Sequence, residues 1–278
     1  MKKLLVVLLV ALLVLASFSF TACGDADKTI TVCASELPHA DILKNCVAGI
    51  LAEQGYTLKV KVIDWEIQND AVAQGDYDAN YFQHVPYLET YAGTTKLFAA
   101  CKVHYEPLGI YKGGKYSTDV SNKTIAICND ESNAVRALQL LYAKGYIAEL
   151  PVQNEQLAFN GDTVVIGDVT IKLIAENLLV ASMPDYTFVC LPCNTALTGK
   201  VDQSLKVDQE DDATLVAGKA NVLAARVNDY ANDPIYKAKV DALVDALLSQ
   251  DVSNYVFEKW GGAITCDNSS QIDLRSGN

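Results

Sequence analysis

The three histidines of the chain are the first residues to examine for chemistry, because each lies in a short polar motif. Imidazole can bind a metal ion, transfer a proton or donate a hydrogen bond to a ligand. A zinc site needs three or four converging ligands, whereas these histidines occur one per motif. We therefore predict no metal site and no cofactor; a ligand pocket, or hydrogen-bonded histidines in the core, remain as interpretations. The motifs are Leu37-Pro38-His39, Asn80-Tyr81-Phe82-Gln83-His84 and His104-Tyr105-Glu106-Pro107.

A second candidate for chemistry is the motif Cys190-Leu191-Pro192-Cys193, which follows a short apolar run. Thiols in such a motif at the start of a helix can have a lowered pKa and exchange disulfides. A thiol–disulfide oxidoreductase is therefore the alternative function, and two packed thiols or an incidental bridge is the structural alternative. No G-x-S-x-G elbow occurs, which disfavours a serine hydrolase.

The N-terminus has the features of a bacterial export signal. Lys2 and Lys3 precede an apolar stretch at residues 4–15, which is shorter than the roughly 20 residues that a membrane-spanning helix needs. Residues 20–23 resemble the lipobox of bacterial lipoproteins, in which a cysteine receives a diacylglycerol before cleavage. We expect residues 1–22 to be a signal peptide and residues 23–28 a tether lipidated on Cys23. The alternative is an ordinary secretory signal that happens to precede a cysteine.

The composition describes an acidic globular protein. Hydrophobic residues make up 50% of the chain and charged residues 20%, and the formal net charge is −12. Such a charge disfavours nucleic acid as a partner. The seven cysteines other than Cys23 are an odd, widely spaced set, typical of small buried hydrophobes rather than of a disulfide scaffold.

Strand and helix patterns alternate along the chain, which predicts an α/β fold. We expect strands at residues 29–33, 58–63, 77–81, 124–128, 188–191 and 222–225, and a hairpin at 164–174 that turns at Gly167. Ser132 is expected to cap one helix, and Asp233 followed by Pro234 another. The length suits two lobes: residues 29–111 plus 224–278 as lobe 1, and residues 112–223 as lobe 2.

Several segments resemble the NlpA/MetQ family of methionine-binding lipoproteins. The resemblance is in sequence, order and spacing, and it covers essentially the whole chain after the signal. The segments are residues 78–88, 104–107, 129–136, 193–197 and 220–222.

This resemblance implies a two-lobed type II periplasmic-binding-protein fold with two crossover strands and no catalysis. It implies that Arg136 holds the carboxylate of methionine or a close relative, since a guanidinium binds a carboxylate at two points. Asn194 and Asn221 would bind the carboxylate and ammonium. The residues implied to form the rest of the cleft are Trp65, Phe82 and His84 around the thioether, with His104 and Glu106 at its border; further candidates are His39, Tyr81, Asn129 and Ser132.

The resemblance also implies partners: an ABC permease, and a membrane to which the lipid on Cys23 anchors the protein, at the outer face of the cytoplasmic membrane or the periplasmic side of a membrane. Each residue has a simpler interpretation. Arg136 could be a surface arginine, Trp65 and Phe82 core residues, and the two asparagines turn or cap residues. The sequence departs from the family at Trp65 and beside Asn194, where Pro192 and Thr195 stand in place of an asparagine and a tyrosine.

Overall fold

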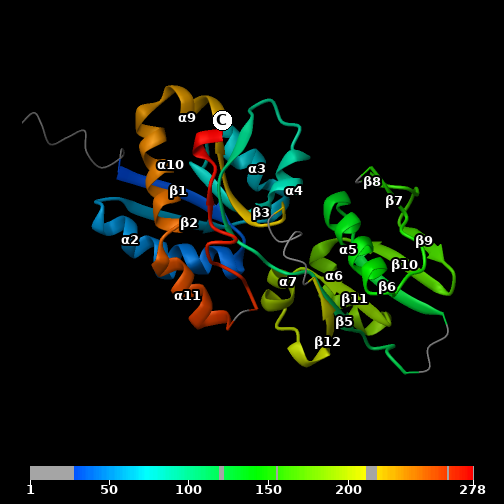
Figure 1. Cartoon of the computed structure of the whole chain (residues 1–278). Helices are drawn as coiled ribbons and strands as arrows, with labels where there is room; N and C mark the ends of the chain where they lie inside the picture. The colour runs from blue at the N-terminus through cyan, green and yellow to red at the C-terminus, as the bar shows by residue number, and fades with distance from the viewer. Residues whose placement is uncertain (1–27, 119–121, 155, 211–217, 262, 278) are drawn as a thin grey trace, which may run out of the picture.

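The computed structural model describes residues 28–118, 122–154, 156–210, 218–261 and 263–277. They form two α/β lobes, each built on a six-stranded mixed sheet (Figure 1). The two-lobed α/β organisation expected from the sequence is confirmed. The expected signal peptide and the tether with Cys23 lie outside the described residues. No helix in the described part is long and apolar enough to cross a membrane.

The first sheet has the order β14-β4-β13-β3-β1-β2. Strands β1, β2 and β3 are parallel, and β13 runs antiparallel between β3 and β4. The strands are β1 (Thr29–Ala34), β2 (Thr57–Val62), β3 (Ala79–His84), β4 (Leu97–His104), β13 (Asn221–Arg226) and β14 (Ile272–Asp273).

The second sheet has the order β12-β5-β11-β6-β10-β9. Strand β6 is parallel to β10 and β11, and β5 is antiparallel to β11. The expected hairpin is confirmed as β9 and β10, with Gly167 at φ +60° in the turn. The strands are β5 (Gly109–Lys112), β6 (Lys123–Cys128), β9 (Thr163–Ile166), β10 (Val169–Ile174), β11 (Phe188–Leu191) and β12 (Lys206–Gln209); β7 (Val152–Gln153) and β8 (Gln156–Leu157) form a separate ribbon.

Helices flank both sheets (Figure 1). In the first lobe they are the π-helical turns η2 (Glu36–Ala40) and η3 (Leu43–Val47), then α2 (Ala48–Glu53), α3 (Trp65–Gln74), α4 (Val85–Glu89), α9 (Val227–Asn232), α10 (Pro234–Leu247), α11 (Gln250–Trp260) and the 3-10 turn η6 (Arg275–Gly277). In the second they are α5 (Glu131–Ala143), α6 (Glu176–Ser182), α7 (Cys193–Thr198) and the 3-10 turns η4 (Met183–Asp185) and η5 (Gln203–Leu205).

Two helix starts test the expected caps. Asp233 caps α10, with its carboxylate accepting from the N–H groups of Ile235 and Tyr236, as expected. The expected cap Ser132 is wrong: Asp130 caps α5 and accepts from the Asn133 N–H. A carboxylate is the stronger acceptor for the positive end of the helix, and Ser132 donates its hydroxyl to that same carboxylate at 2.9 Å.

The chain crosses between lobes twice, and each crossing leads directly into an antiparallel strand of the sheet it enters. The first crossing lies between β4 and β5, and the second between β12 and β13. The expected lobe boundaries, after residues 111 and 223, therefore fall inside β5 and β13. Glycines 113 and 114 mark the end of β5 rather than the crossing, because β5 already pairs with β11 of the second lobe.

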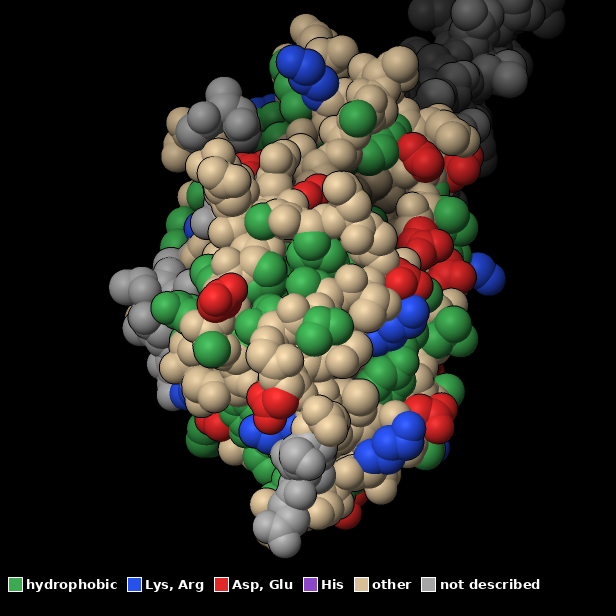
Figure 2. Space-filling model, turned by 90° about the vertical axis from the view of Figure 1, so that its right-hand side faces the viewer, with side chains coloured by type: hydrophobic (Ala, Val, Ile, Leu, Met, Phe, Trp, Pro, Cys, Tyr) green, Lys and Arg blue, Asp and Glu red, His purple; other side chains and the backbone are tan. Residues whose placement is uncertain are grey.

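Each lobe has its own hydrophobic core, and few charged side chains of the described residues are buried. Ile30, Val32 and Leu43 belong to the first core, and Ile125, Leu138 and Ile171 to the second. On the outer face of the second lobe, Figure 2 shows acidic and basic side chains scattered among polar and hydrophobic ones. Most of the candidate site residues lie between the lobes rather than on this outer face.

Candidate functional site

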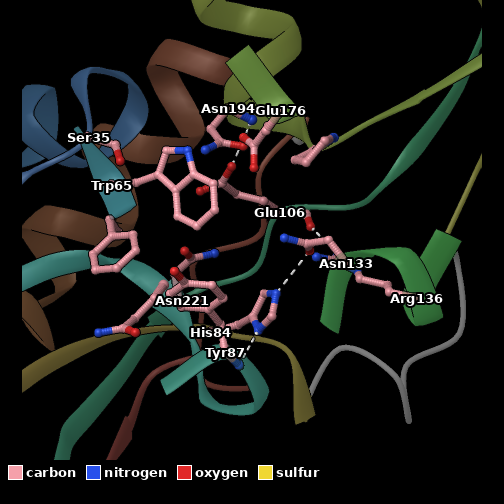
Figure 3. Close-up of a pocket in the computed structure, with 13 residues that line it drawn as sticks. Ser35, Trp65, His84, Tyr87, Glu106, Asn133, Arg136, Glu176, Asn194 and Asn221 are labelled. Atoms are coloured by element: carbon pink, nitrogen blue, oxygen red, sulfur yellow. Dashed lines mark hydrogen bonds between the residues drawn. The ribbon is translucent and has the colours of Figure 1, made fainter. Parts of the chain in front are cut away.

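A cavity of about 490 Å³ lies where the two lobes meet (Figure 3). Seven of the residues implied by the family resemblance line it: Trp65, Phe82, His84, Glu106, Arg136, Asn194 and Asn221. Six further lining residues were not among the candidates: Ser35, Gln83, Tyr87, Asn133, Glu176 and Pro192. Among these, Gln83, Tyr87 and Asn133 lie within the family-like segments, so the sequence did carry a signal for them.

Arg136 is buried on α5 and is held in place by a carboxylate from the second crossing. Its Nε donates to both carboxylate oxygens of Glu210, at 2.8 and 3.0 Å, and its Nη2 donates to the Glu106 carbonyl at 2.7 Å. Burial alone would raise the pKa of Glu210, but the hydrogen bonds and charge of Arg136, helped by the Leu108 N–H and Lys219, lower it to about 2. Glu210 is therefore ionised.

Glu210 also ties the two crossings together. Its Oε2 accepts from the Tyr105 hydroxyl at 2.8 Å and from the Leu108 N–H at 2.9 Å. Sequence reasoning missed this residue, because it stands at the start of an acidic run, Glu210-Asp211-Asp212, that is typical of a solvated loop.

Two of the three histidines contact the carboxylate of Glu106. His104 Nε2 lies 2.7 Å from Glu106 Oε1, and His39 Nε2 lies 3.3 Å from the same oxygen and 3.0 Å from Asn221 Oδ1. Burial raises the pKa of Glu106, but His39, His104 and the Asn194 N–H together lower it below its ordinary value. Burial lowers the pKa of His39 to about 4, against the pull of Glu106, so His39 is a neutral hydrogen-bond donor.

His104 takes part in a longer relay of hydrogen bonds. The Tyr81 hydroxyl is hydrogen-bonded to His104 Nδ1, which leaves Nε2 as the donor to Glu106. Ligand atoms of His39, His104 and Glu106 lie within 4.8 Å of one another, so their positions could accommodate an ion. The Nε2 atoms of both imidazoles face one carboxylate oxygen of Glu106, while the buried Nδ1 of His39 has no hydrogen-bond partner. His39, His104 and Tyr81 thus position Glu106 and do not line the cavity.

His84 and three aromatic rings form the apolar wall. His84 Nδ1 accepts from the Tyr87 N–H and caps α4, and its Nε2 lies 3.1 Å from Asn133 Oδ1 across the lobes (Figure 3). Burial, and then the charge of Arg136, lower the pKa of His84 to about 4. Tyr87 packs edge to face against Trp65 and Phe82, with ring centroids 5.3 and 5.8 Å apart. This wall suits a slender apolar side chain.

The part of the cavity wall next to Trp65 is acidic. The Asn194 N–H donates to Glu106 Oε2 at 2.8 Å, and beside it lies Glu176, the first residue of α6. Glu176 accepts from the Thr195 hydroxyl and lies 3.9 Å from the Cys128 thiol. Burial raises the pKa of Glu176, the hydrogen bond from Thr195 opposes this, and the charges of Asp130 and Glu106 bring it to about 7.

Two expected residues and the redox motif lie elsewhere. Asn129 and Ser132 do not line the cavity: the Asn129 N–H donates to the Ile174 carbonyl, and Ser132 bonds to the cap of α5. Cys190 and Cys193 are free, buried thiols. Burial, with the charge of Glu106, raises the pKa of Cys193 to about 12, the opposite of what disulfide exchange needs. The packed-thiol interpretation of this motif therefore holds.

Known proteins resemble this chain in sequence and in fold. The model of the NlpA lipoprotein family matches residues 30–266. The chain is 33% identical to the methionine-binding lipoprotein MetQ of Bacillus subtilis, over 95% of this chain and 98% of that one. A lipoprotein structure from Ruminococcus gnavus is 33% identical, with a TM-score of 0.74 over 87% of this chain and 100% of that one. A nutrient-binding protein from Burkholderia cenocepacia, solved with methionine, is 25% identical, with a TM-score of 0.71 over 86% of this chain and 99% of that one. Since the family model spans both lobes and both crossings, this chain belongs to the NlpA lipoprotein family.

Proposed function

We propose that this chain captures methionine or a close relative between its lobes and delivers it to an ABC importer. The observation that carries the proposal is the guanidinium of Arg136, buried in the wall of an interlobe cavity with an aromatic wall nearby. The B. subtilis relative is named a methionine-binding lipoprotein, and the B. cenocepacia relative was solved bound to methionine. Both names support the same class of ligand.

The charges around Arg136 favour an anion. Arg136 pairs with Glu210, and Lys219 lies 3.6 Å from Glu210 Oε1. Arg136, Lys219 and Glu210 together carry a net charge of +1, and of these three Arg136 lines the cavity. A ligand carboxylate removed from water needs such a compensating charge, and a guanidinium whose orientation is already fixed loses little entropy when it binds one.

The other lining residues complete an amino-acid site. The amide groups of Asn194 and Asn221 and the ionised Glu106 can receive the α-ammonium, while Trp65, Phe82 and Tyr87 can enclose a thioether. A sulfur atom against an aromatic ring contributes about 0.3–1.5 kcal/mol. His84 and Asn133, hydrogen-bonded between the lobes, are suited to hold the cavity closed over the ligand.

Delivery to a permease requires a position at the membrane. We assign that role to a diacylglycerol on Cys23 followed by the short tether through residue 28, which would hold the protein at the outer face of the cytoplasmic membrane or the periplasmic side of a membrane. Two acyl chains anchor stably, because each buried methylene contributes about 0.8 kcal/mol. Membrane lipoproteins among the relatives support this assignment.

The proposal is tested by identifying the ligand directly. Native mass spectrometry of the purified mature chain should show a retained small molecule that denaturation releases, and titration calorimetry should show saturable binding of L-methionine. Small-angle scattering should show compaction when the ligand is added. A chain that gives no heat and no compaction with any of the twenty amino acids would contradict the proposal.

A further inference from the structure

A second cavity adjoins the ligand pocket and is strongly acidic. It has a volume of about 1130 Å³, is open to solvent, and shares Ser35, Trp65, Glu176 and Asn194 with the first cavity. Three carboxylates line it, whereas no Lys, Arg or His does among the described residues. Its remaining lining residues are Glu36, Leu37, Val62, Ile63, Asp64, Asn177, Val180, Thr195, Thr198 and Gly199.

Glu176 stands where the two cavities join, and its charge is not compensated. It is in no ion pair with a Lys or Arg of the described segments, whereas an oxygen of Asp130 lies within 4.8 Å of its carboxylate and Glu106 lines the same cavity. One hydroxyl, that of Thr195, is its strong hydrogen-bond donor. A partly buried carboxylate beside two others is unfavourable unless a cation meets it.

Trp65 supplies the second feature of this junction. Its indole lines both cavities, and Figure 3 shows it on the same side of the pocket as Glu176 and Asn194. The face of an indole attracts cations, more strongly where water is excluded than where it has access. Val62 and Val180 add apolar surface for the carbons that lead to such a group.

We infer that the second cavity is a subsite for a positively charged group on the ligand's side chain, and that Glu176 selects ligands which carry one. The inference rests on the proposed function, since it takes the ligand carboxylate to be held at Arg136. Arg136 lines the first cavity, and Trp65 and Glu176 line both, so a ligand that extends from one cavity into the other passes these two side chains. A zwitterion such as methionine leaves Glu176 without a partner, whereas an amino acid with a cationic side chain provides one.

Two matched pairs of ligands isolate the charge. L-Norleucine and L-lysine have the same carbon chain and differ by a terminal ammonium, while L-methionine and S-methyl-L-methionine differ by a methyl group that turns the thioether into a sulfonium. Titration calorimetry of the full mature chain at about pH 8 should give at least tenfold tighter binding to the cationic member of one or both pairs. A tenfold change corresponds to about 1.4 kcal/mol.

Variants then assign the preference to one residue. Glu176→Gln should bring the ratio of dissociation constants within each pair to about one, because the carboxylate is lost and the shape is kept. Glu258→Gln, which removes the same charge from an exposed position on α11, should keep the wild-type ratio. A preference for lysine alone identifies an ammonium as the group recognised, and a preference for S-methylmethionine alone identifies a sulfonium.

The outcomes separate this inference from the proposed function. Methionine or norleucine binding with no preference for either cationic partner would overturn the subsite and leave the proposed function standing. A preference that survives Glu176→Gln would also overturn it. Failure of all four ligands to bind would contradict the inference and the proposed function together.

Discussion

Two glutamates near one pocket, Glu176 in its wall and Glu210 behind Arg136, behave in opposite ways. Glu210 lies against Arg136 and has a pKa of about 2, while Glu176 lies near Asp130 and Glu106 and has a pKa of about 7. Burial raises the pKa of both. The neighbouring residues therefore decide the difference in pKa. Glu210 is ionised without a ligand, whereas a cation beside Glu176 would stabilise its ionised form.

Removing Arg136 is expected to have the largest effect on binding. Arg136→Ala should weaken methionine binding by about thirtyfold to several thousandfold, since truncating one partner of a buried charge-assisted pair costs about 2–5 kcal/mol. Arg136→Lys should restore part of the affinity, because it keeps the charge without the planar fork. Titration calorimetry measures the change. Wild-type affinity in Arg136→Ala would mean that the carboxylate is bound elsewhere.

A control is needed because Arg136→Ala also leaves Glu210 buried and unpaired. The double variant Arg136→Ala with Glu210→Gln removes both charges, and circular dichroism should show a native spectrum. Loss of binding in this folded variant would then report on the ligand contact.

Glu210 itself should matter most for stability. Glu210→Ala removes the acceptor shared by Arg136, Tyr105 and Leu108 and leaves the guanidinium uncompensated. Breaking a buried pair in this way costs about 3–5 kcal/mol of the free energy of unfolding. Urea denaturation measures it. A loss below about 1 kcal/mol, the level of an exposed pair, would show that the pair contributes little.

The two glutamates should give opposite dependences of stability on pH. Glu210, with its lowered pKa, contributes stability above about pH 4.5 that is lost as the pH falls toward 2. Between pH 4.5 and 7, Glu176 is still protonated in the folded state but ionised in the unfolded chain. The free energy of unfolding therefore decreases as the pH rises through that window.

In the wild type, ionisation of Glu176 should lower the free energy of unfolding by about 1–3 kcal/mol between about pH 5 and pH 8. Glu176→Gln should abolish this decrease. The measurement is the free energy of unfolding of wild type and variant at both pH values. Glu258→Gln again serves as the control for the loss of one surface charge. Parallel pH curves for wild type and Glu176→Gln would mean that Glu176 ionises as an ordinary glutamate.

Among these variants, a substitution of Lys219 should have the smallest effect on ligand binding. Lys219→Gln removes the second cation beside Glu210, and the summed charge of Arg136, Lys219 and Glu210 falls from +1 to zero. The ammonium is 3.6 Å from Glu210, too far for a strong hydrogen bond, so we expect only a two- to fivefold weaker binding of methionine, or about 0.5–1 kcal/mol. The effect should shrink in high salt.

The sequence predicted the alternation of strands and helices, the hairpin at Gly167 and the cap at Asp233, because each depends on residues that are neighbours in the chain. It misplaced the lobe boundaries, since membership of β5 and β13 in a sheet depends on distant pairing partners. The same reason explains the missed site residues. Whether a glutamate is a solvated surface residue, a partner of Arg136 or an unpaired carboxylate depends on which residues the tertiary structure places beside it. The sequence around Glu210 and Glu176 does not distinguish these three outcomes.

The path of the chain between the lobes also sets an order in which the molecule can fold. All strands of the second sheet come from one continuous stretch, whereas the first sheet needs β13, which arrives after the whole second lobe, between β3 and β4. Bringing such distant segments together closes a long loop and is slow. During synthesis the second lobe can fold first, while β3 and β4 still lack β13, the strand that pairs between them. Because Asn221 enters the pocket only with β13, the pocket can be complete only after the chain of the second lobe has been made.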